Sequence, residues 1–147
     1  MAFPSNFTFE EMTVSQTAAR KSISNKPTGK TLNNLETTAQ LMVAVREILG
    51  NKPIIVSSGY RSPALNKVIG GVDTSAHTLG WAVDFTCPGF GSPLKIAEHL
   101  AKELPKHHIK FDQIIHEYGS WVHISFDPRY REQLLTIDSS GTKTGLH

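Results

Sequence analysis

One short stretch of the sequence brings together a histidine, a glycine and an aspartate in a pattern that could bind a metal ion. His77 lies in a turn that Gly80 allows to bend sharply, and Asp84 follows inside an otherwise apolar run. An ionised carboxylate between Val83 and Phe85 is costly to bury unless it is paired or bound to a metal. An aspartate that points to solvent from a half-exposed strand is the plainer alternative, and this stretch alone fits both.

A second histidine lies within residues 121–126, which have the pattern of a strand. Trp121, His123 and Ser125 share one face of that strand, opposite its clearly apolar face. A lone strand histidine is usually structural. Two imidazoles and one carboxylate, however, are a suitable ligand set for catalytic zinc, which takes three protein ligands and leaves a fourth position for water.

The chain contains seven histidines, and their placement separates candidate ligands from surface residues. His147 is the terminal residue and is expected to be disordered. Surface or capping roles are the better interpretation for three others, His99, His107 and His108. This leaves His77, His116 and His123, each on or beside an expected strand or a glycine-bounded loop.

The elements that would position these residues are typical of an α+β fold. Helical periodicity and N-cap residues predict helices over residues 8–21, 32–49, 62–69 and 94–104. Short β-branched or alternating runs predict strands over residues 53–58, 81–86, 111–117, 121–126 and 133–137, the last at an edge. A tight turn at Gly119 joins two of these strands into a hairpin. We therefore expect an antiparallel sheet packed against helices.

Length and composition indicate one domain. A chain of 147 residues is large enough to close a single hydrophobic core, which we expect over residues 1–138, with a flexible tail over 139–147. Hydrophobic residues make up 39% and charged residues 19%, as in globular proteins. The single cysteine, Cys87, excludes an intramolecular disulfide and a cysteine metal cluster. A monomer is expected.

Charge and hydropathy argue against several classes of partner. The formal net charge is +2 and the basic residues, Arg129 and Arg131 among them, form no long run, so we expect no nucleic-acid partner. No apolar stretch approaches the roughly 20 residues that span a bilayer, and residues 1–12 do not resemble a secretory signal. Synthesis in a cytoplasm without a signal peptide is therefore expected.

Three ordered blocks of the sequence together resemble the M15 peptidases. The blocks are Ser-Gly-Tyr-Arg-Ser at residues 58–62, Ser-x-His-x-x-Gly-x-Ala-x-Asp at 75–84 and Trp-Val-His at 121–123. The family comprises zinc D-Ala-D-Ala carboxypeptidases and peptidoglycan endopeptidases, whose fold is shared with the hedgehog signalling domain. The resemblance covers about residues 7–126 and is closest to the small stand-alone form often encoded by bacteriophages and prophages.

The resemblance implies a role for individual residues. It makes His77, Asp84 and His123 the ligands of one zinc ion per chain. Arg61 resembles the family's arginine that binds a carboxylate or carbonyl oxygen of the substrate, and a guanidinium can form paired hydrogen bonds to a carboxylate. A surface arginine near the start of a helix is the structural alternative for Arg61. Ser75 resembles a hydroxyl that helps to hold substrate near the metal, although it could equally be a turn residue.

The residue that moves protons departs from the common family pattern. Many members carry a glutamate three residues before the last histidine ligand, whereas this chain has Ser120, which cannot act as a base. A three-residue hairpin loop would place Glu117 opposite Trp121, on the face of His123, whereas a two-residue turn would pair His116 with His123 there. The sequence fits both registers. The hedgehog-like branch carries a glutamate on this strand, so the resemblance favours Glu117, with His116 as the alternative base or transition-state donor.

The resemblance implies a zinc metallopeptidase that hydrolyses peptidoglycan stem peptides, as a D-Ala-D-Ala carboxypeptidase or an endopeptidase. Two alternatives stay open: a non-catalytic, zinc-stabilised phage module that binds cell wall or protein, and a structural phage component with a metal-free histidine cluster. Ser120 keeps the binding module open. The chain is expected to reach the cell wall after release by other lysis proteins, or as a virion-associated protein.

Overall fold

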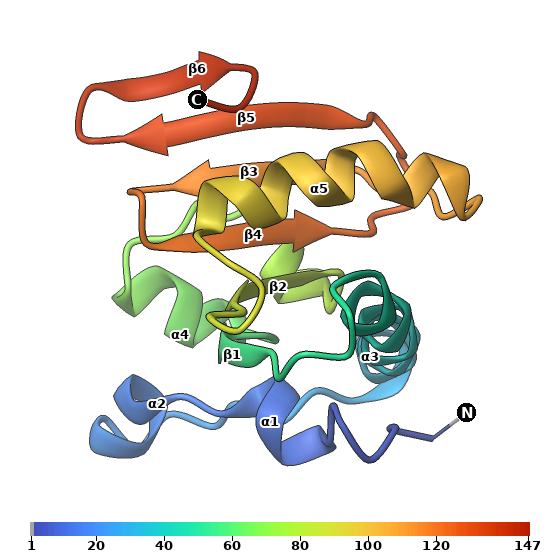
Figure 1. Ribbon diagram of the computed structural model, residues 1–147. Helices are drawn as coiled ribbons and strands as arrows, with labels where there is room; N and C mark the ends of the chain where they lie inside the picture. Colours follow the sequence, from blue (N-terminus) through green and yellow to red (C-terminus); the bar gives the residue numbers. More distant parts are fainter. Residues whose placement is uncertain (1) are drawn as a thin grey trace.

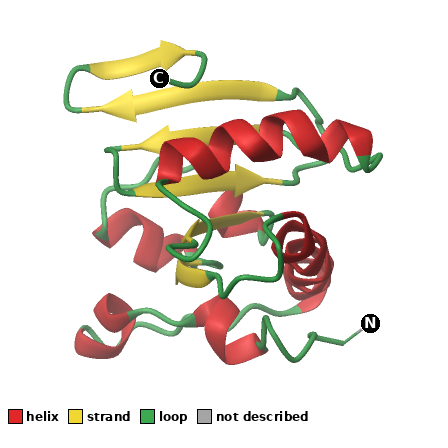
Figure 2. Ribbon diagram, viewed as in Figure 1, coloured by secondary structure: helices red, strands yellow, loops and turns green. Residues whose placement is uncertain are grey.

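The computed structural model describes residues 2–147, and in this part of the chain helices pack around a single sheet (Figure 1, Figure 2). The helical elements are α1 (Phe9–Thr13), α2 (Gln16–Arg20), α3 (Gly29–Ile48), α4 (Pro63–Val68), the 3₁₀ turn η1 (Ala76–Leu79) and α5 (Pro93–Lys106). The strands are β1 (Ile55–Ser58), β2 (Ala82–Thr86), β3 (Gln113–Glu117), β4 (Trp121–Ser125), β5 (Gln133–Asp138) and β6 (Gly141–Thr144). Among the described residues, no helix combines the length and hydropathy needed to cross a membrane.

The six strands lie in the order β1-β2-β4-β3-β5-β6. The α+β class is confirmed, and neighbouring strands are antiparallel except for β3 and β5, which pair in parallel. This one pair departs from the expected antiparallel pattern because the chain leaves β4 and passes to the far side of β3. Since β4 runs antiparallel to β3, the next strand enters the sheet in the direction of β3.

One face of the sheet forms the hydrophobic core. Alternate side chains of the central strands are fully buried there, namely Val83 and Phe85 of β2, Ile114 of β3, and Val122 and Ile124 of β4. Helix α5 lies across β3 and β4, and α3 lies beside it at the β2 side (Figure 1). Because successive strand residues point to opposite faces, the intervening side chains face away from this core, and the candidate site is built from them.

The helix expected over residues 8–21 is two helices. Thr8 caps α1 in the predicted capping box with Glu11. Val14 then turns to an extended conformation with ψ of 137°, and Ser15 starts α2 by accepting a hydrogen bond from the backbone N–H of Ala18. A second N-cap residue inside the periodic run thus divides it.

Residues 139–147, expected to be a flexible tail, are largely structured. β6 pairs with β5 in antiparallel register after a turn in which Asp138 accepts from the backbone N–H of Ser140 at 2.8 Å. The hydroxyl of Thr136 on β5 donates to the carbonyl of Gly145 at 2.8 Å. His147, expected to be disordered, donates its backbone N–H to the same hydroxyl at 3.0 Å. Side-chain and backbone hydrogen bonds therefore hold a segment whose polar composition alone indicated disorder.

Candidate functional site

Pairing between β2 and β4 sets two of the predicted ligands directly opposite each other. Asp84 is the cross-strand partner of His123, and directly opposed residues have their Cβ atoms about 5 Å apart. Nδ1 of His123 lies 3.0 Å from Oδ1 of Asp84. Both side chains are buried, on the face of the sheet opposite the hydrophobic core.

The third predicted ligand is delivered by the 3₁₀ turn that precedes β2. Ser75 caps this turn by accepting a hydrogen bond from the backbone N–H of His77 at 3.2 Å. Gly80 ends it in the left-handed conformation, with φ of 81°, and the chain then enters β2. This turn brings Nε2 of His77 to 3.1 Å from Oδ1 of Asp84. Donor atoms of His77, Asp84 and His123 all lie within 4.8 Å of one another.

The hydrogen bonding of His77 tests whether these three residues fit a cation. Nδ1 of His77 lies 2.7 Å from the carbonyl oxygen of Gly59, which can only accept, so Nδ1 carries the proton. In the neutral ring, the lone pair of Nε2 therefore faces the Asp84 carboxylate. Metal-binding histidines commonly hold their second nitrogen in this way. The Nε2 lone pair of His77 and the carboxylate oxygen of Asp84 therefore face each other with no proton between them. A cation bound between the two groups fits this arrangement.

Electrostatics around the site favour that arrangement of protons. Burial lowers the pKa of His77 below its ordinary value, despite the opposing effect of Asp84, so the ring is neutral near pH 7. His77 therefore has the neutral protonation state that a metal-binding imidazole requires.

A cleft of about 600 Å³ opens beside the three candidate ligands. The predicted site residues that line it are Arg61, Ser75, His77, Asp84, Glu117 and His123. The β3–β4 hairpin has a three-residue loop, which sets Glu117 opposite Trp121. Oε1 of Glu117 lies 3.9 Å from Nδ1 of His123. Burial, with a further contribution from Asp84, raises the pKa of Glu117 above its ordinary value, as suits a carboxylate that exchanges protons.

His116 and Ser120 lie away from this cleft. His116 is paired with Val122, which belongs to the core side of the sheet. Its Nδ1 donates to the carbonyl oxygen of His147 at 2.9 Å. Ser120 is exposed in the hairpin loop, where its hydroxyl donates to the carbonyl of Tyr118. Of the residues weighed for proton transfer, the structure thus brings only Glu117 to the candidate metal ligands.

Arg61 faces the cleft from the loop that follows β1. Its Nη2 lies 3.4 Å from the hydroxyl of Ser75, and its backbone N–H donates to the carbonyl of His77 at 3.2 Å. Nε of Arg61 is buried without a hydrogen-bond partner among the residues described. Burial lowers the pKa of Arg61, and Asp84 and Glu117 oppose this effect, so the guanidinium stays charged. A buried, charged donor without a partner is suited to an acceptor oxygen of a ligand.

Asn25 holds the loop of Arg61 in place, a role that the sequence did not reveal. Its side-chain amide donates to the carbonyl oxygens of Thr13 and Tyr60, at 2.8 and 3.0 Å. Its Oδ1 accepts from the backbone N–H of Ser62 at 2.7 Å. The residues on both sides of Arg61 are therefore tied to one amide. A single asparagine in a turn gives no sequence signal of such long-range contacts.

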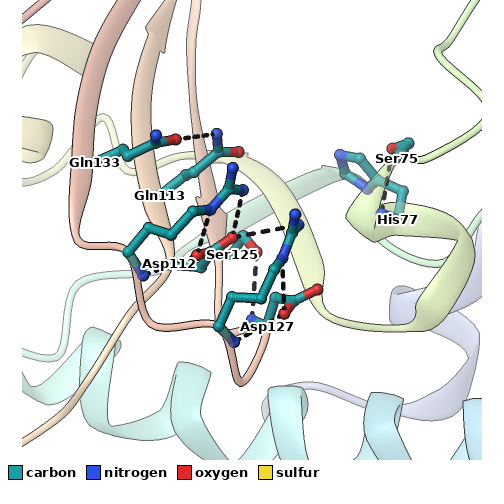
Figure 3. A network of polar contacts seen from close by, with 9 residues as sticks. Ser75, His77, Asp112, Gln113, Ser125, Asp127 and Gln133 are labelled. Atoms are coloured by element: carbon teal, nitrogen blue, oxygen red, sulfur yellow. Dashed lines mark hydrogen bonds and ion pairs between the residues drawn. The ribbon is translucent and has the colours of Figure 1, made fainter.

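A network of charged side chains lies at the end of β4 away from the β3–β4 loop (Figure 3), and its two arginines, Arg129 and Arg131, border the same cleft. Asp112 is fully buried and binds Arg131 through two side-chain hydrogen bonds, at 2.9 and 2.8 Å. Arg129 binds Asp127 through Nε at 3.2 Å. From the sequence, both arginines were expected to be scattered basic residues. Asp112, next to Phe111 at the start of the strand expected over residues 111–117, was the nearest sequence signal of this network.

Comparison with known proteins gives the family of this chain. The family model of Peptidase M15 matches residues 5–125. This match covers most of the chain, including every residue of the candidate metal site. The chain belongs to the Peptidase M15 family, and this places it among the hydrolases.

A curated relative is the zinc D-Ala-D-Ala carboxypeptidase of Streptomyces albus G. The two proteins are 39% identical over 51 residues, which is 35% of this chain. The aligned stretch spans only about a fifth of the relative's length, 20% of it.

Proposed function

We propose that this chain is a zinc-dependent peptidase that hydrolyses the stem peptides of peptidoglycan. The observation that carries the proposal is the convergence of His77, Asp84 and His123, with Nδ1 of His77 held by a backbone carbonyl. Membership of the Peptidase M15 family and similarity to a zinc D-Ala-D-Ala carboxypeptidase support both the metal and the substrate class.

The three donors suit one zinc ion, because imidazole nitrogens and a carboxylate oxygen are ligands that zinc prefers. Zinc bound there would supply a Lewis acid and lower the pKa of a water molecule at its open position. The surrounding residues orient the ligands. The carbonyl of Gly59 holds the His77 ring, and pairing of β2 with β4 holds Asp84 against His123.

Two cleft residues take the remaining chemical roles in the proposal. Oε1 of Glu117 accepts a proton from the attacking water and transfers it to the leaving amine. Its raised pKa suits both steps. The guanidinium of Arg61 donates to a carboxylate or carbonyl oxygen of the bound peptide, which offers its buried Nε–H a partner. Ser75 helps to orient Arg61 through its hydroxyl.

Within this proposal, carboxypeptidase activity is favoured over cleavage of internal bonds. Arg61 is charged and can bind a planar carboxylate through two parallel hydrogen bonds, as the terminal carboxylate of a stem peptide would require. The proposal includes the stand-alone bacteriophage-type form, which other lysis proteins or a virion would bring to the cell wall.

Peptide hydrolysis by the zinc-loaded chain, measured beside Glu117→Gln, tests the proposal. Release of D-Ala or of stem-peptide fragments is expected from the unmodified chain, with the rate lowered about 100-fold or more in the variant. Glutamine keeps the shape of the side chain but cannot accept the proton. Equal rates for both proteins would remove Glu117 from its role.

A non-catalytic binding module is the second candidate, because the position at which many family members carry a glutamate holds Ser120, which lies outside the cleft. That candidate predicts one equivalent of bound zinc and binding of peptidoglycan fragments without any release of peptide. Mass spectrometry of the fragments after incubation separates it from the peptidase.

A further inference from the structure

Beyond the candidate metal site, the cleft is bordered by two arginines, Arg129 and Arg131. Both lie in the loop that leads from β4 to β5. Their side chains are 53% and 36% exposed, whereas the Asp112 side chain that binds Arg131 is 0% exposed and that of Asp127 is 10% exposed. The carboxylates therefore lie beneath the arginines, and the positive groups face the solvent of the cleft.

The buried carboxylates hold the arginines without using all of their donors. A guanidinium carries five N–H groups. Arg131 donates hydrogen bonds to Asp112 from two of its nitrogens, Nε and Nη2. Asp112 also accepts the backbone N–H of Arg131 at 2.9 Å, which fixes the position of the residue as well as its side chain. Arg129 is held by two carboxylates, because Asp127 accepts both its backbone N–H and its Nε, and its Nη2 lies 3.6 Å from Oδ2 of Asp112. The remaining N–H groups of both arginines are therefore held in position for a ligand.

Strand register gives the separation between the candidate ligand His123 and the end of the sheet that leads into the loop of Arg129 and Arg131. His123 is paired with Ile115, and Ser125, two residues further along β4, is paired with Gln113. Two residues of β4, about 7 Å at the usual rise per residue, therefore separate His123 from that end of the sheet. Figure 3 shows Asp112, Asp127 and Gln113 grouped on one side, with His77 across from them. An extended peptide covers that distance in about two residues.

We propose that Arg129 and Arg131 form a carboxylate-binding subsite, which selects peptides with an acidic group about two residues from the bond that is cleaved. This inference rests on the proposed peptidase function and adds a second determinant of specificity to Arg61. The planar guanidinium matches a carboxylate in paired hydrogen bonds. Gln113, which also lines the cleft and is bound to Gln133 at 2.8 Å, adds a polar neighbour to the subsite.

Calorimetric titration of the zinc-loaded Glu117→Gln protein tests this subsite without requiring hydrolysis. The probes are two matched peptides that end in D-Ala-D-Ala and differ only in carrying a glutamate or a glutamine two residues before the bond to be cleaved. We expect the acidic peptide to bind about 10-fold more tightly. Adding Arg129→Gln should reduce this preference to about 2-fold or less, whereas Arg129→Lys should retain part of it.

Arg20→Gln is the charge-matched control, because Arg20 is exposed on α2 and lies outside the cleft. It should leave the 10-fold preference unchanged. Equal affinity for the two peptides, or a preference that survives Arg129→Gln, would overturn the proposal. Inorganic phosphate that binds the protein more tightly than the acidic peptide, and loses affinity in Arg129→Gln, would also overturn it in favour of a phosphate site. Failure of the unmodified zinc-loaded chain to cleave either peptide counts against the peptidase function alone, because the ratio of the two dissociation constants still reports on the subsite.

Discussion

Oδ1 of Asp84 is the atom on which the candidate metal site converges, since it lies 3.1 Å from Nε2 of His77 and 3.0 Å from Nδ1 of His123. The lone pair of Nε2 of His77 faces this oxygen, and two buried acceptors at that distance repel each other unless a cation lies between them. The site should therefore depend on each ligand for its metal, and on none of the histidines that lie outside it.

Elemental analysis of purified variants checks this dependence. We expect about one equivalent of zinc per chain in the unmodified protein and a near-complete loss in His123→Ala, because zinc retains only two ligands. His99→Ala is the matched control, since His99 contacts Phe90 and the carbonyl of Ile48, outside the cleft. A full equivalent of zinc in His123→Ala would contradict the assignment of the ligands.

Asp112 links stability to pH. Burial acts to raise the pKa of Asp112, but the hydrogen bonds from Arg131 hold it below its ordinary value. A carboxyl group whose folded-state pKa is lowered contributes stability above its unfolded pKa, about 3.9, and this stability is lost as the pH falls through the folded-state pKa.

Asp112→Asn should therefore lower the free energy of unfolding by about 2 kcal/mol at pH 7. The difference from the unmodified chain should shrink as the pH falls below about 4, because the Asp112 carboxyl group of the unfolded chain becomes protonated there, and it should vanish as the pH falls through the lower folded-state pKa. Urea unfolding at several pH values measures both. A difference that does not change between pH 7 and pH 3 would show that the charge of Asp112 does not contribute.

At the scale of elements, η1 determines where His77 lies relative to β2. Helix α3 holds this turn, because the side chains of Asn34 and Thr38 donate to the carbonyl oxygens of Leu79 and Gly80, at 2.9 and 2.7 Å. Gly80 has both a left-handed backbone and a close neighbour. A Cβ atom added there would lie 2.7 Å from the carbonyl oxygen of Thr31.

Gly80→Ala should consequently lower stability by about 2 kcal/mol or more, since it combines left-handed strain with a backbone clash. It should also weaken zinc binding at least 10-fold, because η1 must shift relative to Asp84. Gly50→Ala is the matched control: its φ is 76°, but a Cβ atom there meets nothing within 4 Å. Thermal unfolding and zinc titration compare the two, and equal effects would contradict the role given to the contact with α3.

The parts of the site that were predictable from the sequence are those that depend on residues close together in the chain. The residue types and order of His77, Asp84 and His123 were readable, because each lies in a short local pattern. The hairpin register that brings Glu117 to the cleft stayed open, since turn chemistry permitted two loop lengths. Contacts between distant segments, such as that of Asn25 with the loop of Arg61, leave no periodic signal in the chain.

The fold was predictable to a similar degree. Hydrophobic alternation and N-cap residues indicated most helices and strands and the α+β class. The parallel pairing of β3 with β5 was not indicated, because it depends on which side of the sheet the chain takes after β4. The division of the helix over residues 8–21 depends on a second N-cap residue, and the structured tail depends on side-chain and backbone hydrogen bonds to β5; composition reveals neither.

At the scale of the whole molecule, the C-terminal hairpin completes the sheet. β6 covers the outer edge of β5, and Leu146 packs against the hydrophobic core. Deletion of residues 139–147 should lower the free energy of unfolding by about 2 kcal/mol, comparable to exposing one leucine side chain. The melting temperature should then fall by roughly 4–8 °C. Differential scanning calorimetry measures this, and an unchanged melting temperature would return these residues to the status of a flexible tail.

The contact between α1 and Gly59 has a consequence for any shortened version of the protein. A Cβ atom on Gly59 would overlap the backbone carbonyl of Met12, which also accepts the backbone N–H of Tyr60 at 2.8 Å. Helix α1 therefore packs directly against Gly59, whose carbonyl oxygen orients His77. Removal of residues 1–13 to ease expression would take this support away from His77. We expect such a protein to fold around its sheet but to bind zinc more weakly.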